Sequence, residues 1–238
     1  MDKEQKIPWK RLTTEGAVIV VSILLAFAID AWWEERQERR AQLQSLARVA
    51  AEIEANTTVA KNKVEALQKA IDSTSEYLAW VGPEPKAVSV EDYSQKWTEI
   101  LEIGMFALVR RATDEYLGMG SPISEKEAVT RDALLAWYAE GDLILGQYEL
   151  LRDEHAALVD YNVRRTPLMV TMSTLREMQN HPVSKFTFDP AEAMADPTEE
   201  SLLAVYLLRM EFVVRRLEGL IDSQTALVDE IQATIDAG

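Results

Sequence analysis

The stretch Leu12–Trp33, LTTEGAVIVVSILLAFAIDAWW, decides the architecture of this chain. Its uncharged centre, Gly16 to Ile29, has 14 residues and would measure about 21 Å as an α-helix. Trp9 lies before this centre and Trp32 and Trp33 lie after it, about 35 Å away along a helix, which matches the two aromatic belts of a bilayer. We therefore predict a transmembrane helix over residues 12–33, with these three tryptophans as interfacial anchors.

Two other interpretations of this segment are open from the sequence. A basic start, an apolar run and Ala26-Phe27-Ala28 resemble a cleaved signal peptide. A buried helix of a soluble protein would also be apolar, although the placement of the tryptophans and the basic flank would then be coincidences. The transmembrane anchor accounts for the apolar run and for both flanks, and we prefer it.

The charges beside the span bear on its orientation. Four Lys/Arg residues precede it, whereas the three that follow closely, Arg36, Arg39 and Arg40, are mixed with glutamates. The Lys/Arg count therefore favours an N-terminus on the inside. We expect a short cytoplasmic tail over residues 1–11, a single pass through a bacterial inner membrane, and a main domain in the periplasm.

One side of the predicted span carries polar and small residues. At about 100° per residue, Glu15, Ser22 and Ala26 fall in a narrow stripe, with Asp30 some 60° away. The spacing Ser22-x-x-x-Ala26 allows two helix backbones to approach closely. This stripe is either a contact face for another membrane helix, or two carboxylates that simply lie at the level of the lipid headgroups.

Composition indicates a helical protein with an acidic soluble part. The chain has 238 residues, of which 47% are hydrophobic, with only 9 Gly and 8 Pro. Residues 34–238 hold 21 Lys/Arg and 36 Asp/Glu, so they carry the whole net charge of −15. Such a charge disfavours nucleic-acid binding. The absence of cysteine excludes disulfides, thiolate metal sites and cysteine nucleophiles.

The helix is expected to continue beyond the membrane. From residue 43 onward, apolar or small residues recur at alternating steps of three and four, which is the pattern of a coiled-coil-like helix over residues 34–81. The frame consists of Leu43, Leu46, Ala50, Ile53, Thr57, Ala60, Val64, Leu67, Ile71, the Thr/Ser region at Ser73–Ser75, Leu78 and Val81. Gly82-Pro83-Glu84-Pro85 should end it. A rod this long needs a partner along its length, either another part of the chain or copies of itself.

Residues 86–238 are predicted to form a helical domain. We expect one helix from Ser89 to about 117, and another from the capping box at Ser124 to about 162. A shorter helix is predicted over 168–179, and residues 185–188 are either a short strand or an extended segment. Asp196-Pro197 is a strong helix start. The last helix, 198–236, should pack back along the first, giving an all-α antiparallel bundle.

Two blocks of the chain resemble a family of uncharacterised bacterial single-pass membrane proteins. The first contains Thr14-Glu15-Gly16, the apolar run, and then Ile29-Asp30-Ala31-Trp32-Trp33-Glu34-Glu35-Arg36. The second runs from Arg111-Ala112-Thr113-Asp114-Glu115-Tyr116-Leu117 to the helix with Trp137 and Tyr138. The resemblance implies an anchored, helical extracytoplasmic domain, and it brings no catalytic residues with it.

The sequence offers little chemistry. His155 and His181 are the only histidines; no metal ligand lies three or four residues from His155, and His181 precedes Pro182 in a loop. We find no nucleophile elbow and no glycine-rich phosphate loop, so we predict no enzyme, no cofactor and no metal. Paired arginines recur, and they either form surface ion pairs or converge on an anionic ligand. These are Arg110, Arg111, Arg164, Arg165, Arg215 and Arg216.

These observations lead to two hypotheses of function. The first is a membrane-anchored interaction or scaffold protein that contacts lipid and either itself or another membrane protein, as an oligomer or as an accessory subunit of a larger complex. The second is an extracytoplasmic ligand-binding sensor. Because its predicted cytoplasmic tail is only about a dozen residues long, such a sensor would need a partner to signal.

Overall fold

The computed structural model describes residues 9–120, 122, 124–167 and 185–236, with side chains from residue 17 onward in the first helix. Within these ranges there are six helices and no strand, which confirms the predicted all-α class. The helices are α1 (Trp9–Leu78), α2 (Val90–Leu101), α3 (Arg111–Gly118), α4 (Glu125–Arg165), α6 (Pro190–Met194) and α7 (Pro197–Asp236).

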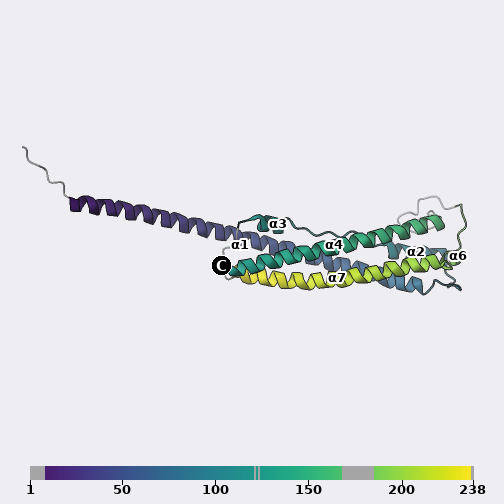
Figure 1. The fold of residues 1–238 in the computed structure, drawn as a ribbon. Helices are drawn as coiled ribbons and strands as arrows, with labels where there is room; N and C mark the ends of the chain where they lie inside the picture. Colours follow the sequence, from purple (N-terminus) through teal and green to yellow (C-terminus); the bar gives the residue numbers. More distant parts are fainter. Residues whose placement is uncertain (1–8, 121, 123, 168–184, 237–238) are drawn as a thin grey trace, which may run out of the picture.

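The long helices form an up-and-down bundle with one protruding end (Figure 1). The chain runs outward along α1, returns through α2, the irregular residues 102–110 and α3, runs outward again along α4, and returns along α7. Helix α7 packs along both α1 and α4, while α2 and α3 pack against α1. The first half of α1 extends beyond the bundle, so its continuation from residue 45 is one leg of the bundle itself.

The core of the bundle follows α1 in alternating steps of three and four. The residues that face it are Leu46, Val49, Ile53, Asn56, Ala60, Lys63, Leu67, Ala70, Thr74 and Tyr77. The predicted frame matches this stripe at Leu46, Ile53, Ala60 and Leu67, and Ala50 and Ile71 beside it are also buried. It is wrong at Thr57 and Val64, which lie at the edge, because Asn56 and Lys63 are buried in their place.

The predicted helix starts are confirmed by their caps. Ser89 Oγ accepts from the Asp92 N–H at 3.0 Å, and Ser124 Oγ accepts from the Glu127 N–H at 3.2 Å. At the start of α7, Asp196 Oδ1 accepts from the Thr198 N–H at 2.8 Å, with Pro197 as the first helical residue. Each cap satisfies a backbone donor that the first turn leaves free.

The single helix predicted from Ser89 to 117 is wrong. Helix α2 ends at Leu101, and α3 begins only at Arg111, because residues 102–110 are extended and Gly104 takes a φ of +57°. Side chains of α1 and α4 hydrogen-bond this segment in place of a helical ladder. Residues 185–188 are irregular and form no strand, and the helix predicted over 168–179 lies outside the described residues.

Candidate functional site at the membrane junction

The apolar part of α1 touches nothing else in the described structure. It is the one described helix that is long and apolar enough to cross a membrane, and none of its apolar window is buried. Val20 and Phe27 are 55% and 67% exposed. A core helix of a soluble protein would be covered, so that interpretation is wrong. A membrane span and a signal sequence both fit the observation.

The predicted contact face of the span is unoccupied within the described chain. Ser22 Oγ donates to the Val18 carbonyl at 2.8 Å, so its hydroxyl is satisfied inside its own helix, as apolar surroundings require. Ala26 and Asp30 are exposed. The side chains of Glu15 and of the predicted anchor Trp9 lie outside the described residues.

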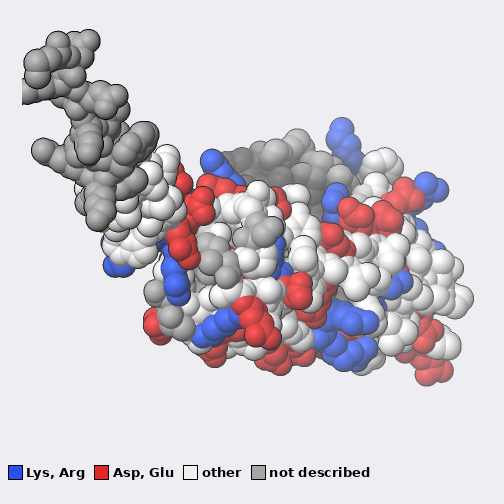
Figure 2. All heavy atoms as spheres, turned by 60° about the vertical axis from the view of Figure 1, so that its left-hand side comes forward, with Lys and Arg blue, Asp and Glu red and all other residues white. Residues whose placement is uncertain are grey.

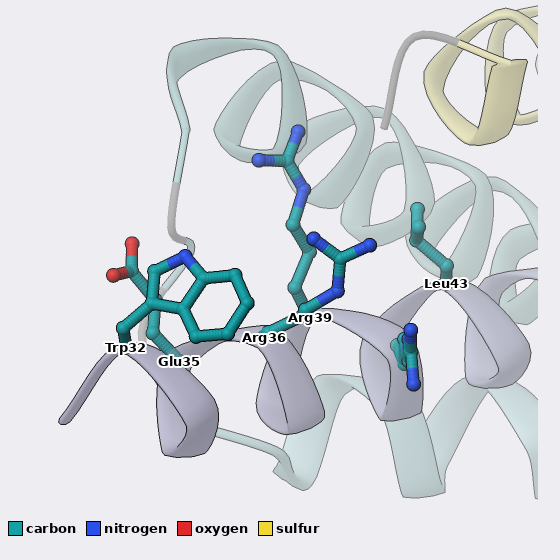
Figure 3. Close-up of a pocket in the computed structure, with 6 residues that line it drawn as sticks. Trp32, Glu35, Arg36, Arg39 and Leu43 are labelled. Carbon is teal, nitrogen blue, oxygen red and sulfur yellow. The ribbon is translucent and has the colours of Figure 1, made fainter. Parts of the chain in front are cut away.

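The junction between the apolar segment and the bundle combines aromatic and basic side chains. The rings of Trp32 and Trp33, each more than half exposed, have centroids 6.2 Å apart. The Arg36 guanidinium lies 5.6 Å from the centre of the Trp32 ring. Figure 3 shows Arg36 and Arg39 beside Trp32 and Leu43, around an open hollow of about 360 Å³ lined by α1 alone.

Charges at this junction are divided between two sides of α1. At 100° per residue, Arg36, Arg39 and Arg40 fall within about 60° of one direction, together with both tryptophans. The glutamates at 34 and 38 fall on the opposite side, whereas Glu35 lies about 40° from Arg39 and lines the same hollow as the arginines. Arg39 and Arg40 make no ion pair with any described residue. Because the three arginines lie about 5 to 11 Å beyond Trp33 along the helix, they are at the height of lipid phosphates if the tryptophans mark the membrane interface.

The end of the bundle that faces the apolar helix has no single sign of charge. Figure 2 shows acidic and basic side chains interspersed over this end, next to the emerging helix. Between it and the apolar segment, residues 34–44 of α1 form a stalk of about 16 Å. Residues 34–41 of this stalk are exposed all round. The junction is therefore accessible to lipid and to other proteins.

The arginine pairs do not converge on one pocket. Arg110 pairs with Asp142 and stacks 4.0 Å from the centre of the Tyr138 ring. Arg164 pairs with Asp160, about 27 Å further along α4, and Arg165 pairs with Asp196. Of the others, Arg216 lies over Phe212, and Arg111 and Arg215 are exposed. The predicted surface ion pairs are thus found at three of the six positions, and the structure assembles no common anion site.

A buried polar cluster at the far end of the bundle was not predicted. Glu199 is completely buried, and its Oε1 accepts a hydrogen bond from the Tyr77 hydroxyl, which in turn accepts from Trp97 Nε1 at 3.1 Å. Glu199 Oε2 has no hydrogen-bond partner among the described residues. Burial raises the pKa of Glu199 to about 7, against the lowering effect of the Tyr77 hydrogen bond and of Arg165. From sequence, a glutamate in the first turn of a helix is typical of an exposed N-terminus, so nothing signalled this burial.

Lys63 is the second unpredicted buried group. It is 6% exposed and donates to the Ile103 carbonyl and, at 3.3 Å, to the Tyr148 hydroxyl. Burial lowers the pKa of Lys63. Tyr148 also donates to the Gly104 carbonyl, so both side chains satisfy the extended backbone between α2 and α3. Their role is to hold this segment in place.

The described part of the chain contains no group of three or more His, Asp or Glu side chains that could hold a metal. His155, one of the two histidines, has Nε2 3.0 Å from the Leu101 carbonyl. No protein-family profile matches the chain, and no curated protein or solved structure is significantly similar to it. The junction and the bundle surface are therefore the features that bear on function.

Proposed function

We propose that this chain is a membrane-anchored interaction protein, which acts as an oligomer or as an accessory subunit of a larger bacterial inner-membrane complex. The observation that carries the proposal is the continuity of α1: one helix of 70 residues runs from the exposed apolar segment into the core of the bundle. A contact made by the span is therefore connected rigidly to the outer domain, with no flexible linker between them.

The surroundings of the apolar segment support membrane anchoring. Trp32 and Trp33 provide the amphipathic rings that favour the interface, and Arg36, Arg39 and Arg40 provide charges for lipid phosphates just above it. Lipid is thus the first partner. The second is another membrane protein, or a second copy, on the Glu15, Ser22, Ala26 and Asp30 side of the span.

The interior of the bundle supports an interaction role over a ligand-binding one. Arg110 and Arg165, expected at an anionic ligand, instead pair with carboxylates of the same chain. The buried polar groups Lys63 and Glu199 face backbone and aromatic side chains. The outer surface of the bundle is therefore the part available to a binding partner, and the stalk holds it about 16 Å or more from the membrane.

Membrane integration can be tested by extraction. After fractionation of cells that express the full chain with a C-terminal tag, we expect the intact chain to stay in the membrane pellet in alkaline carbonate and to be released by detergent. A chain that begins after Ala28 and appears in the soluble fraction would show that the segment is a cleaved signal, and would overturn the anchor.

Orientation can be tested with single cysteines, since the native chain has none. We expect a membrane-impermeant maleimide to label Thr225→Cys, on the exposed surface of α7, in cells whose outer membrane alone has been permeabilised. Lys3→Cys should be labelled only after the inner membrane is opened. The reverse pattern would place the domain in the cytoplasm.

The interaction role is tested by mild detergent purification from the native membrane, with mass measurement of the intact complex. The expected result is a species heavier than one chain with its detergent, which contains either a second copy or a distinct membrane protein in fixed proportion. A strict monomer at the expression level of the native cell would contradict the proposal.

A further inference from the structure

The outward side of α4 carries an exposed apolar seam that the bundle does not use. The seam consists of Leu135, Ala136, Ala139, Leu143, Gly146 and Leu150. Its three leucines are 52%, 69% and 44% exposed, in chain order. From Ala136 the steps alternate three and four, which is the spacing at which one helix packs along another. The fold therefore contains a second heptad stripe that no described helix covers.

No packing contact in the described structure requires glycine at position 146. A Cβ added there would meet nothing within 4 Å, so the fold does not require glycine at this position. Glycine inside a helix costs about 1 kcal/mol relative to alanine. The contrast is Gly141 one turn earlier, where a Cβ would come within 2.5 Å of Arg110 and 2.8 Å of Leu108. Gly146 opens a notch between Leu143 and Leu150 through which another backbone can approach closely.

The charges beside the seam indicate what fits it. The stretch from Asp132 to Leu151 contains no Lys or Arg. The exposed carboxylates of Asp132, Glu149 and Asp153 border the seam and make no ion pair with any described residue. A helix with basic residues on its flanks would complement this border, whereas one with acidic flanks would be repelled.

A second copy fits the seam poorly. Two chains anchored in one membrane relate by an axis along the membrane normal, so their α4 helices would meet in parallel at the same height. Glu149, on the flank of the seam, would then lie opposite the other copy's Glu154, which already pairs with Arg209 of its own chain, and Asp153 opposite Asp153. Helix α4 contains no Lys or Arg between Arg131 and Arg152 to balance them. Like charges in contact oppose such a pairing.

We propose that the α4 seam docks an amphipathic helix of another protein, one with large apolar residues along its contact side and Lys or Arg beside them. The seam lies about 25 to 50 Å beyond Trp33, judged from the contact of Tyr148 with Lys63 on α1. The partner helix must therefore reach well clear of the membrane surface. The inference rests on the proposed function: the seam is the surface through which an accessory subunit would bind its partner.

The test uses the full chain in lipid nanodiscs and two synthetic helical peptides. Both peptides carry the same leucine and isoleucine seam, with lysine at the flanking positions of one and glutamate at those of the other. In fluorescence anisotropy at physiological salt, we expect the lysine peptide to bind and the glutamate peptide not to bind. Equal binding of both peptides, or binding of the glutamate peptide alone, would overturn the charge argument.

Two glycine variants separate the seam from general attraction to an acidic protein. Gly146→Ala fills the notch and should weaken binding of the lysine peptide about tenfold, whereas Gly219→Ala should leave it unchanged. Gly219 is equally open, but it lies on α7 beside the charged Glu218 and Asp222. Both variants should unfold at the same or a higher temperature than the parent, because alanine favours helix. If the parent and Gly146→Ala bind the lysine peptide equally, the seam is not the docking surface.

A photo-crosslinking amino acid at Ala139 tests the occupant in the native membrane. An adduct with a different protein that disappears in the Gly146→Ala background is expected. An adduct of two copies of this chain would replace the partner helix with self-association. These outcomes are independent of carbonate extraction, so a failure of the seam and a failure of the membrane anchor can be told apart.

Discussion

Asn56 pairs with Val109 through both ends of its side-chain amide. Nδ2 donates to the Val109 carbonyl at 2.6 Å, and the Val109 N–H donates to Oδ1 at 2.9 Å. The amide thus acts towards the extended residues 102–110 as a neighbouring strand would. Together with Lys63 and Tyr148, it replaces the helical hydrogen bonds that this segment lacks, and it explains why a polar residue occupies a core position of α1.

Replacing Asn56 with leucine should destabilise the bundle strongly. Both backbone groups of Val109 would lose their partner at a part-buried position, which should cost about 1 to 3 kcal/mol in free energy of unfolding. Urea unfolding followed by circular dichroism measures this change. Gln68→Ala, on the exposed side of α1, is the matched control and should change stability by less than about 0.5 kcal/mol. Similar effects of the two variants would show that the Asn56 pair does not anchor the segment.

The buried Glu199 should make stability depend on pH. Its pKa is about 7 in the folded chain and near 4.5 in the unfolded one, so the folded state binds the extra proton between these values. Stability should therefore be highest below about pH 4.5 as far as this group is concerned, and should fall as pH rises to about 7, by at most about 1.4 kcal/mol per pH unit. The other ionisable groups that interact electrostatically with this carboxyl are Tyr77, Tyr93, Tyr161 and Arg165.

Glu199→Gln should remove that dependence, because the amide stays neutral at all pH values. We expect the variant to unfold at a higher urea concentration than the parent at pH 8, with the difference shrinking towards pH 5. Glu200→Gln, at the exposed neighbouring position, should leave the pH profile unchanged. A parent profile that is flat from pH 5 to 8 would mean that the folded Glu199 has an ordinary pKa.

Gly141→Ala should destabilise the protein although alanine favours helix. The new methyl group would displace Arg110, which holds Asp142 and the Tyr138 ring, and would crowd Leu108. Overpacking of this kind costs about 1 to 3 kcal/mol. Thermal unfolding should therefore place Gly141→Ala below the parent and Gly146→Ala at or above it. The same sign for both substitutions would contradict the close approach of Arg110 to α4.

A proline in the stalk should uncouple the two halves of α1 without unfolding the bundle. Gln37 is exposed and makes no described side-chain contact, so Gln37→Pro should break the helix locally, at a cost of about 3 kcal/mol, while the bundle keeps its unfolding temperature. Spin labels at Ala26 and Thr58 report the coupling: the parent should give one narrow distance distribution and the variant a broad one. A narrow distribution in the variant would contradict the isolated stalk.

The sequence predicted the elements that depend on local rules. The caps at Ser89, Ser124 and Asp196 appear where their residue types occur, and a long apolar helix is present near the N-terminus. A residue-type pattern suffices for these features because each depends on a few neighbouring positions.

The features that sequence missed depend on partners far along the chain. The sequence pattern places Thr57 and Val64 in the core of α1, because burying the neighbouring Asn56 and Lys63 is unfavourable without hydrogen-bond partners. The fold supplies those partners: Val109 for Asn56 and Ile103 for Lys63. The break between α2 and α3 also depends on distant residues, since Asn56, Lys63 and Tyr148 hydrogen-bond the backbone of this segment. The arginine pairs are indistinguishable in sequence. The fold separates them, because Arg110 pairs with Asp142 and Arg165 pairs with Asp196.

The uninterrupted α1 also fixes a rotational phase. Each residue turns the helix by about 100°. The number of residues in the stalk therefore sets the angle, about the helix axis, between the Ser22 and Ala26 side of the span and the outer face of α4. One residue added or removed near Gln37 would rotate the whole bundle by about 100° about the membrane normal, while the contacts within the bundle stayed the same. A neighbour that binds both surfaces would lose one of them on such an insertion. Eighteen added residues, five full turns, would restore the direction but would move the bundle about 27 Å further from the span.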